Sequence, residues 1–184
     1  MKTAEKYDVR YKMAEALEII MQTKAFSKIS VTDITNISGV SRQTFYRHFK
    51  DIYDMVNWIH AERTQLSIDI FAETNDVVES FYIIFTMMQR YKNFYRYAIT
   101  LEGPNSFSDY YSEAFIHACK NHIGETDLNE EILFAICFWA EGATKLIVKW
   151  IRSNMEMSPK TFASYLYKSI PNNLKKFYIN KICW

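Results

Sequence analysis

A short segment near the N-terminus, GVSRQTFYRHF at residues 39–49, gathers guanidinium, amide, imidazole and hydroxyl groups without a single carboxylate. Phe45 and Phe49 lie four residues apart, so in a helix they share one apolar face and can be buried while the polar side chains face outward. Guanidinium and amide groups on a helix can bond base edges in the DNA major groove, and hydroxyl and imidazole groups can reach phosphates. The DNA-binding residues that this reasoning predicts are Ser41, Arg42, Gln43, Thr44, Tyr46, Arg47, His48 and Lys50.

A solvated polar helix face, which is common in helical proteins, is the plain alternative. Two features favour DNA binding instead. No acid lies between Ser41 and Lys50, and a helix of seven or eight residues buries too little surface to persist without a positional role. Gly39 fits a tight turn before this helix, because glycine reaches positive φ without steric cost. Two short helices joined by such a turn predict a helix-turn-helix.

A second segment, SEAFIHACKNH at residues 112–122, contains side chains that bind metals. Glu113 and His117 are four residues apart and could share a helix face, whereas Cys119 and His122 lie on other faces, so one helix cannot bring all four together. We interpret the segment as an amphipathic helix with its polar residues exposed. A helical metal-binding protein or enzyme that uses these four residues is the alternative of a different class.

The elements that must position these residues are expected to be helices. The chain has 184 residues with only 4 glycines and 3 prolines, and that scarcity of turn residues argues against an all-β fold. A net charge of +1 does not by itself point to a nucleic-acid partner, so the prediction of DNA binding rests on the local charge of residues 39–50. No catalytic motif is present, so we expect neither an enzyme nor a cofactor. Three cysteines without CxxC spacing, no signal peptide and no apolar run of membrane-spanning length favour a cytoplasmic protein.

Apolar spacing predicts three short helices at the N-terminus and long helices after them. The first runs from Val9 to Met21, and Ser30 caps a second that must end before Gly39. Ser41 caps the third, which ends near Lys50. Further helices are predicted at about 51–72, 75–92, 94–102, 106–122, 127–153, 158–170 and from 173 onward. No strand or internal repeat is expected.

The stretch ISVTDITNISGVSRQTFYRHFKDIYDMV resembles the N-terminal signature of the TetR family of transcriptional regulators. The resemblance covers about residues 8–60 and implies an all-helical homodimer. It implies a three-helix DNA-binding domain at residues 1–52 and a helical effector-binding and dimerisation domain at residues 53–184. In the family, Thr32 matches a phosphate-contacting hydroxyl, and the positions of Arg42, Gln43 and Thr44 commonly face bases.

The same comparison assigns Tyr46 and His48 to the DNA backbone. The sequence departs from the family at Ile52, where many members place a lysine that binds a phosphate, and Lys50 is the candidate substitute. Gln43 stands where the family usually has glycine or another small residue, which could widen base readout.

Large side chains crowd residues 81–115, and most of them are expected to be core. Tyrosines buried at helical spacing need partners for their hydroxyls, so some could line an amphipathic effector cavity. The candidate pocket residues are Phe81, Phe85, Met88, Tyr95, Tyr110, Tyr111, Phe115 and Phe138.

The segment ILFAICFWAEGATKLIVKWI, residues 132–151, is apolar around most of its helical circumference. Such a helix is expected to be covered on several sides, by its own domain and by a second subunit. The candidate dimer-interface residues are Ile136, Ala140, Ala143, Ile147, Phe162 and Leu166. A two-fold dimer would present two recognition helices to a palindromic operator in double-stranded DNA.

The sequence therefore predicts a homodimeric DNA-binding transcriptional regulator, in this family more often a repressor, that a small-molecule effector releases from its operator. A second reading keeps DNA binding but makes the protein a co-activator controlled by a protein partner, in which case the aromatic region is solid core. A structure without a cavity of about 300 Å³ would favour that reading.

Overall fold

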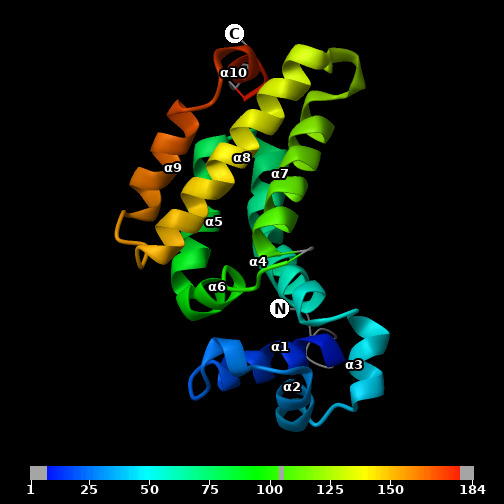
Figure 1. Cartoon of the computed structure of the whole chain (residues 1–184). Coiled ribbons are helices and arrows are strands. Elements are labelled where there is room, and N and C mark those ends of the chain that lie inside the picture. Colours follow the sequence, from blue (N-terminus) through cyan, green and yellow to red (C-terminus); the bar gives the residue numbers. More distant parts are fainter. Residues whose placement is uncertain (1–7, 104–105, 179–184) are drawn as a thin grey trace. The chain divides into compact units, whose positions relative to one another are not determined.

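The structure is a computed structural model that describes residues 8–103 and 106–178 (Figure 1). These residues form helices and contain no strand, which confirms the predicted all-α class. The α-helices are α1 (Val9–Ile20), α2 (Val31–Ser38), α3 (Arg42–His48), α4 (Ile52–Thr74), α5 (Val77–Arg90), α6 (Lys92–Ala98), α7 (Phe107–Ile123), α8 (Glu130–Arg152), α9 (Pro159–Lys168) and α10 (Asn172–Tyr178). Within the described ranges, no helix combines the length and the apolar character needed to cross a membrane.

The ends of the short N-terminal helices follow from their capping residues. Ser30 and Asp33 form a reciprocal capping box at the start of α2, in which each side chain bonds the other residue's backbone N–H. Gly39 ends α2 in the left-handed conformation at φ 67°, as the turn requires, and its N–H donates to the carbonyl of Thr35. Ser41 then caps α3 by accepting from the N–H of Thr44. The predicted caps and turn are confirmed.

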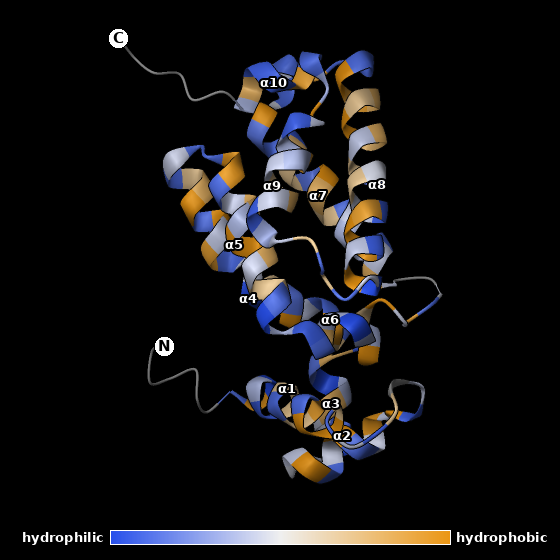
Figure 2. Cartoon of the chain, turned by 90° about the vertical axis from the view of Figure 1, so that its left-hand side faces the viewer, coloured by the Kyte–Doolittle hydropathy of each residue, from blue (hydrophilic) through white to orange (hydrophobic). Residues whose placement is uncertain are grey.

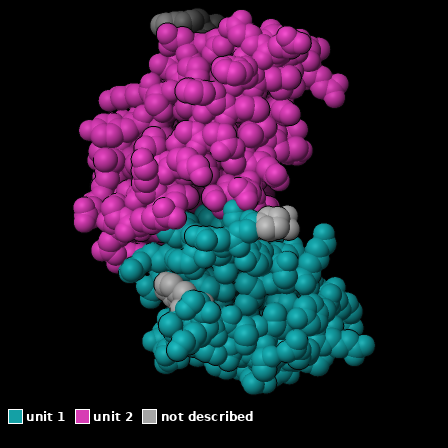
Figure 3. All heavy atoms as spheres, viewed as in Figure 1, with its two compact units in different colours: residues 1–62, 93–107 teal, residues 63–92, 108–184 magenta. Residues whose placement is uncertain are grey.

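The contacts divide the chain into two compact units (Figure 3). Unit 1 comprises residues 1–62 and 93–107, and unit 2 comprises residues 63–92 and 108–184. The division cuts α4, whereas the predicted domain boundary lies at its first residues, between 52 and 53. That boundary stays a prediction.

The core of unit 1 contains the two phenylalanines of the recognition segment. Phe45 is fully buried and Phe49 is 3% exposed, and their ring centroids are 5.7 Å apart. Phe49 also lies 5.6 Å from the ring of Trp58 on α4. The apolar stripe of α1 is buried in the same unit. The predicted anchoring of α3 by its aromatic side chains is therefore confirmed.

Residues 93–103, together with 106–107, belong to unit 1, and they contact the first half of α4. The hydroxyl of Tyr53 donates to the carbonyl of Glu102 over 2.7 Å, and Nδ1 of His60 lies 3.0 Å from the hydroxyl of Tyr95. Both His60 and Tyr95 are buried. Burial raises the pKa of neighbouring Tyr97 to about 12, so its hydroxyl stays neutral. These contacts make a segment from the middle of the sequence part of unit 1.

Unit 2 is a helical bundle in which α5 packs against α9. Aromatic rings pack where α5, α8 and α9 meet. The ring centroid of Phe162 on α9 lies 4.9 Å from those of Phe85 on α5 and Trp150 on α8, and the rings of Trp150 and Phe162 are stacked. Hydrophobic residues recur along α5 and α8 (Figure 2). The predicted aromatic core is therefore built mainly from ring-to-ring contacts, which fill space densely.

Candidate nucleic-acid interface

Helix α3 presents a continuous polar face to solvent. Arg42, Gln43, Tyr46 and Arg47 are exposed, and no acidic residue lies on the helix. Phe45 on the opposite side is buried. The spacing of this helix thus separates an apolar anchor from a face rich in donors, as the sequence predicts.

The remaining predicted contacts flank this face. Ser41 accepts from the backbone N–H of Thr44 over 3.0 Å, and its Oγ lies 2.9 Å from Oγ1 of Thr44. Thr44 is half-buried, while His48 and Lys50 are exposed. The caps therefore fix the start of α3 and leave its C-terminal cations accessible.

Arg42 is held close to α2. Its Nη1 donates to Oγ1 of Thr32 over 2.6 Å, and its Nη2 donates to the hydroxyl of Tyr46 over 3.5 Å. The guanidinium carbon lies 5.9 Å from the centre of the Tyr46 ring. The structure brings Thr32, Arg42 and Tyr46 together, although the resemblance assigns Arg42 to a base and the two hydroxyl groups to the DNA backbone.

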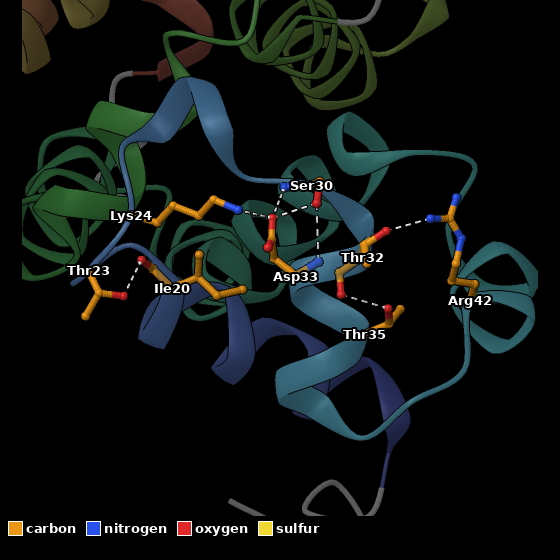
Figure 4. Close-up of polar contacts among 8 residues, drawn as sticks. All are labelled: Ile20, Thr23, Lys24, Ser30, Thr32, Asp33, Thr35 and Arg42. Carbon is orange, nitrogen blue, oxygen red and sulfur yellow. Dashed lines mark hydrogen bonds and ion pairs between the residues drawn. The ribbon is translucent and has the colours of Figure 1, made fainter.

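A polar network positions the start of α2 (Figure 4). Nζ of Lys24 lies 2.6 Å from a carboxylate oxygen of Asp33, which also accepts from the hydroxyl and backbone N–H of Ser30. Lys24, and after it Ser30, lower the pKa of the Asp33 carboxyl to about 2. The capping pair was predictable from sequence spacing, but Lys24 lies in the loop after α1, nine residues before Asp33, and no local spacing identifies it as a partner.

Ile52, at the departure from the family pattern, is the first residue of α4 and is partly buried. The backbone N–H of the preceding Lys50 donates to Asp54 over 2.9 Å, and Asp51 accepts from the N–H of Asp54. These bonds hold the turn between α3 and α4 and leave the Lys50 side chain exposed.

One small cavity lies among the aromatic residues of unit 2. Its volume is about 10 Å³, room for roughly one water molecule. It is lined by Phe81, Phe85, Tyr111, Phe115, Ala143, Ile147 and Leu166. Four of the eight candidate pocket residues line this cavity, and the effector pocket as a whole stays a prediction.

The other candidate pocket residues lie elsewhere. Tyr95 belongs to unit 1, and Phe138 is 73% exposed. Met88 is fully buried and Tyr110 is partly buried, but neither lines the cavity. Helical spacing identifies aromatic crowding, but it does not decide which rings meet around a void.

The six candidate interface residues are buried within unit 2, each less than 10% exposed. Their role in a dimer stays a prediction, but burial leaves little of their surface for a second subunit. The outer side of α8 carries Phe134 and Phe138 instead, each 73% exposed, with their rings stacked. Because α8 is apolar on both sides, its sequence did not distinguish the two faces.

The metal-ligand side chains of α7 have other partners. Nδ1 of His117 lies 3.2 Å from the Asn121 amide, and Nε2 of His122 lies 2.8 Å from the Phe177 carbonyl. Burial raises the pKa of the Cys119 thiol to about 11, which disfavours the thiolate that metals bind. In the described parts of the chain, no three histidine, cysteine or acidic residues converge as metal ligands.

Comparison with known proteins places the C-terminal part of the chain among regulators. Residues 75–172, more than half of the chain, match the sequence model of a transcriptional regulator C-terminal region of TetR type. A stretch of 47 residues is 38% identical to the HTH-type dhaKLM operon transcriptional activator DhaS of Lactococcus lactis subsp. lactis strain IL1403. That stretch covers 26% of this chain and 25% of the relative, so only a quarter of the relative's length is matched in sequence.

Solved structures share the fold across nearly the whole chain. The structure of a dihydroxyacetone kinase operon activator, DhaS, is similar with a TM-score of 0.65 and 17% identity, covering 94% of this chain and 99% of that one. The TetR family repressor AlkX from Dietzia sp. strain DQ12-45-1b is similar with a TM-score of 0.54 and 14% identity, covering 88% and 97%. At these identities the similarity establishes the fold alone.

Proposed function

Because the chain belongs to the TetR family of transcriptional regulators, we propose that it binds double-stranded DNA through the exposed face of α3. The observation that carries the proposal is the pairing of a buried Phe45 with exposed Arg42, Gln43 and Arg47 on one seven-residue helix. A helix of this width enters the major groove, where amide and guanidinium groups can bond base edges. The family is one of regulators rather than enzymes, so the proposed activity is binding.

In this proposal Gln43 and Thr44 meet bases. The Gln43 amide can bond adenine N6 and N7, and the Thr44 methyl can meet a thymine methyl. Phosphate contacts fall to Ser41, Tyr46 and His48 and to the cations Arg47 and Lys50. The exposed Lys50 ammonium, two residues before Ile52, substitutes for the lysine that the family places at the position of Ile52.

The test begins with DNA fragments from the source genome. Fragments that purified protein retains at low salt are sequenced, and the shared site is then tested in gel-shift titrations beside a scrambled duplex. We expect retention of fragments with a two-fold related site, and Gln43→Ala should narrow the affinity difference between site and scrambled duplex. Gln22→Ala, at an exposed position after α1, is the matched control. Failure of the wild-type protein to bind any duplex would contradict the proposal.

We further propose that the DNA-binding form is a homodimer. The exposed side of α8 carries Phe134, Phe138, Gly142 and Lys149 at helical spacing. A pair of stacked, exposed phenylalanines costs solvation free energy that a second copy can recover by covering them. Two-fold symmetry then presents two copies of α3 to the two half-sites of a palindromic operator, whose centres lie about 34–36 Å apart, one turn of DNA.

An antiparallel pairing of two α8 helices suits this face. When the two-fold axis crosses the exposed side of α8 at the height of residue 140, Phe138 meets Gly142 of the second copy. A Cβ atom at Gly142 would have no neighbour within 4 Å. The same register sets Glu131 against Lys149 and Phe134 against Leu146, which is 48% exposed. Each contact occurs twice, as an isologous interface requires.

Regulation is proposed to act through a protein partner rather than through a bound small molecule. The cavity of about 10 Å³ among the aromatic rings of unit 2 is itself too small for a small molecule, because small-molecule pockets have volumes of about 300 Å³ or more. Binding of a small effector in that cavity would require the surrounding rings to move apart. A thermal-shift screen of small metabolites separates the two: a hit that raises the unfolding temperature and changes operator affinity would favour the effector.

A further inference from the structure

Arg42 lies between two hydroxyl groups that are both predicted to contact the DNA backbone. We infer that Arg42 organises Thr32 and Tyr46 into one phosphate-binding cluster, so that in this chain it positions backbone contacts instead of reading a base. The inference rests on the proposed DNA binding and refines it by naming what each side chain recognises. The Thr32–Arg42–Tyr46 cluster joins α2 to α3, and Figure 4 shows its bond between Arg42 and Thr32.

The direction of the hydrogen bonds determines what the cluster can bind. Arg42 donates in both bonds, so the oxygens of Thr32 and Tyr46 accept and both hydroxyl protons stay available. Within the residues that the structure describes, neither hydroxyl is seen to donate to a protein group. The cluster thus offers two O–H donors and the unused guanidinium N–H groups around one positive charge. A phosphodiester, which is anionic and has only acceptors, complements that set.

No carboxylate neutralises the cluster. Arg42 forms no ion pair in the described part of the chain, and the nearest acid in sequence to Thr32, Asp33, is bound to Lys24 and Ser30. All three members are exposed. The positive charge of Arg42 is therefore available to bind a phosphate, while the carboxylate of nearby Asp33 is neutralised by its ion pair with Lys24.

Base reading by Arg42 competes with this arrangement. A bidentate contact to guanine uses two neighbouring guanidinium N–H groups, and Nη1 and Nη2 each already commit one N–H group to the cluster. Turning those two N–H groups to a base would release Thr32 and Tyr46 together. Gln43, the next residue, is exposed and free of such bonds in the described structure, so it takes the base-reading role.

The experiment compares two observables, sequence discrimination and salt dependence. Fluorescence anisotropy with the retained operator duplex and a scrambled duplex, repeated over a series of salt concentrations, gives both for each variant. Arg42→Ala is expected to weaken both duplexes by the same factor, at least about tenfold, and to reduce the slope of log affinity against log salt by about one. Gln43→Ala is expected to do the reverse, lowering the operator preference and keeping the slope.

Matched variants test the cluster itself. Thr32→Val, which removes the hydroxyl, should weaken both duplexes equally, while Thr32→Ser should restore the wild-type affinity. In the Thr32→Val, Arg42→Ala double variant the two losses should fall short of additive, since each breaks the same cluster. Arg152→Ala, with the same charge change at an exposed position on α8, should change neither observable.

The inference is overturned if Arg42→Ala lowers operator preference with an unchanged slope, or if Thr32→Val and Arg42→Ala add independently. Circular dichroism spectra of all variants must match that of the wild type. Arg42→Lys, which keeps the charge, provides a second readout, because it should retain the slope of log affinity against log salt. Absence of binding by the wild type itself would remove the proposed function and this inference together. The two failures are therefore distinguishable.

Discussion

Nζ of Lys24 lies 2.6 Å from the carboxylate of Asp33, so an ion pair joins the loop after α1 to the first turn of α2. The pKa of Asp33 is lowered to about 2, which means that the folded protein favours its ionised form. A lowered folded-state pKa contributes stability that is present above the unfolded value of about 3.9 and is lost as the pH falls toward 2. Asp33→Asn should therefore lower the unfolding temperature at pH 6, and the difference from wild type should shrink between about pH 4 and pH 2. Thermal unfolding followed by circular dichroism across that range tests this, and a constant difference would contradict it.

The serine at the start of α2 gives a second prediction. Ser30→Ala removes one half of the capping box and should destabilise the protein by about 1 kcal/mol in urea unfolding. Ser27→Ala, at an exposed position four residues from the start of α2, is the control and should leave the midpoint unchanged. Equal effects of the two substitutions would show that the cap is not responsible.

The buried phenylalanine of α3 gives a third. Phe45→Ala should cost about 3–5 kcal/mol, because it removes a fully buried ring and leaves a cavity. Operator binding should be lost with it, since α3 has no other large buried side chain. Phe134→Ala removes an exposed ring of the same size and should leave stability of the isolated chain within about 0.5 kcal/mol.

The proposed pairing of α8 predicts changes in oligomeric state without loss of folding. Phe138→Ser should shift sedimentation from dimer to monomer, because it removes an apolar ring that is 73% exposed in the single chain. Gly142→Leu should do the same by filling the space proposed for that ring, although a Cβ atom at this position has no neighbour within 4 Å in its own subunit. Leu66→Ser, at a residue 63% exposed on α4, is the control and should stay dimeric. A wild-type monomer at all concentrations would contradict the dimer itself.

Local chemistry made most helix boundaries predictable. Ser30 and Ser41 were identified as caps from sequence, and each accepts a hydrogen bond from the backbone N–H of the residue three positions later. Gly39 was identified as the turn residue and has the positive φ that the turn requires. Such signals act within a few residues, so the sequence alone contains them.

Features that depend on distant partners were not predictable in this way. Helix α8 is apolar on most sides, and only the packing of unit 2 decides that Ile136 is buried while Phe138 is exposed. The contact of Arg42 with Thr32 likewise joins residues ten positions apart through a turn. Side-chain spacing along one helix describes that helix, whereas pockets and clusters are produced by several elements together.

Segment 93–107 has a practical consequence for protein engineering. Since Tyr53 bonds Glu102 and His60 bonds Tyr95, an expression fragment that ends between the start of α4 and residue 93 leaves part of the core of unit 1 behind. Chimeric regulators made by a single crossover would expose those surfaces to water and aggregate. A chimera that keeps unit 1 intact therefore has to exchange both of its segments, residues 1–62 and 93–107, together.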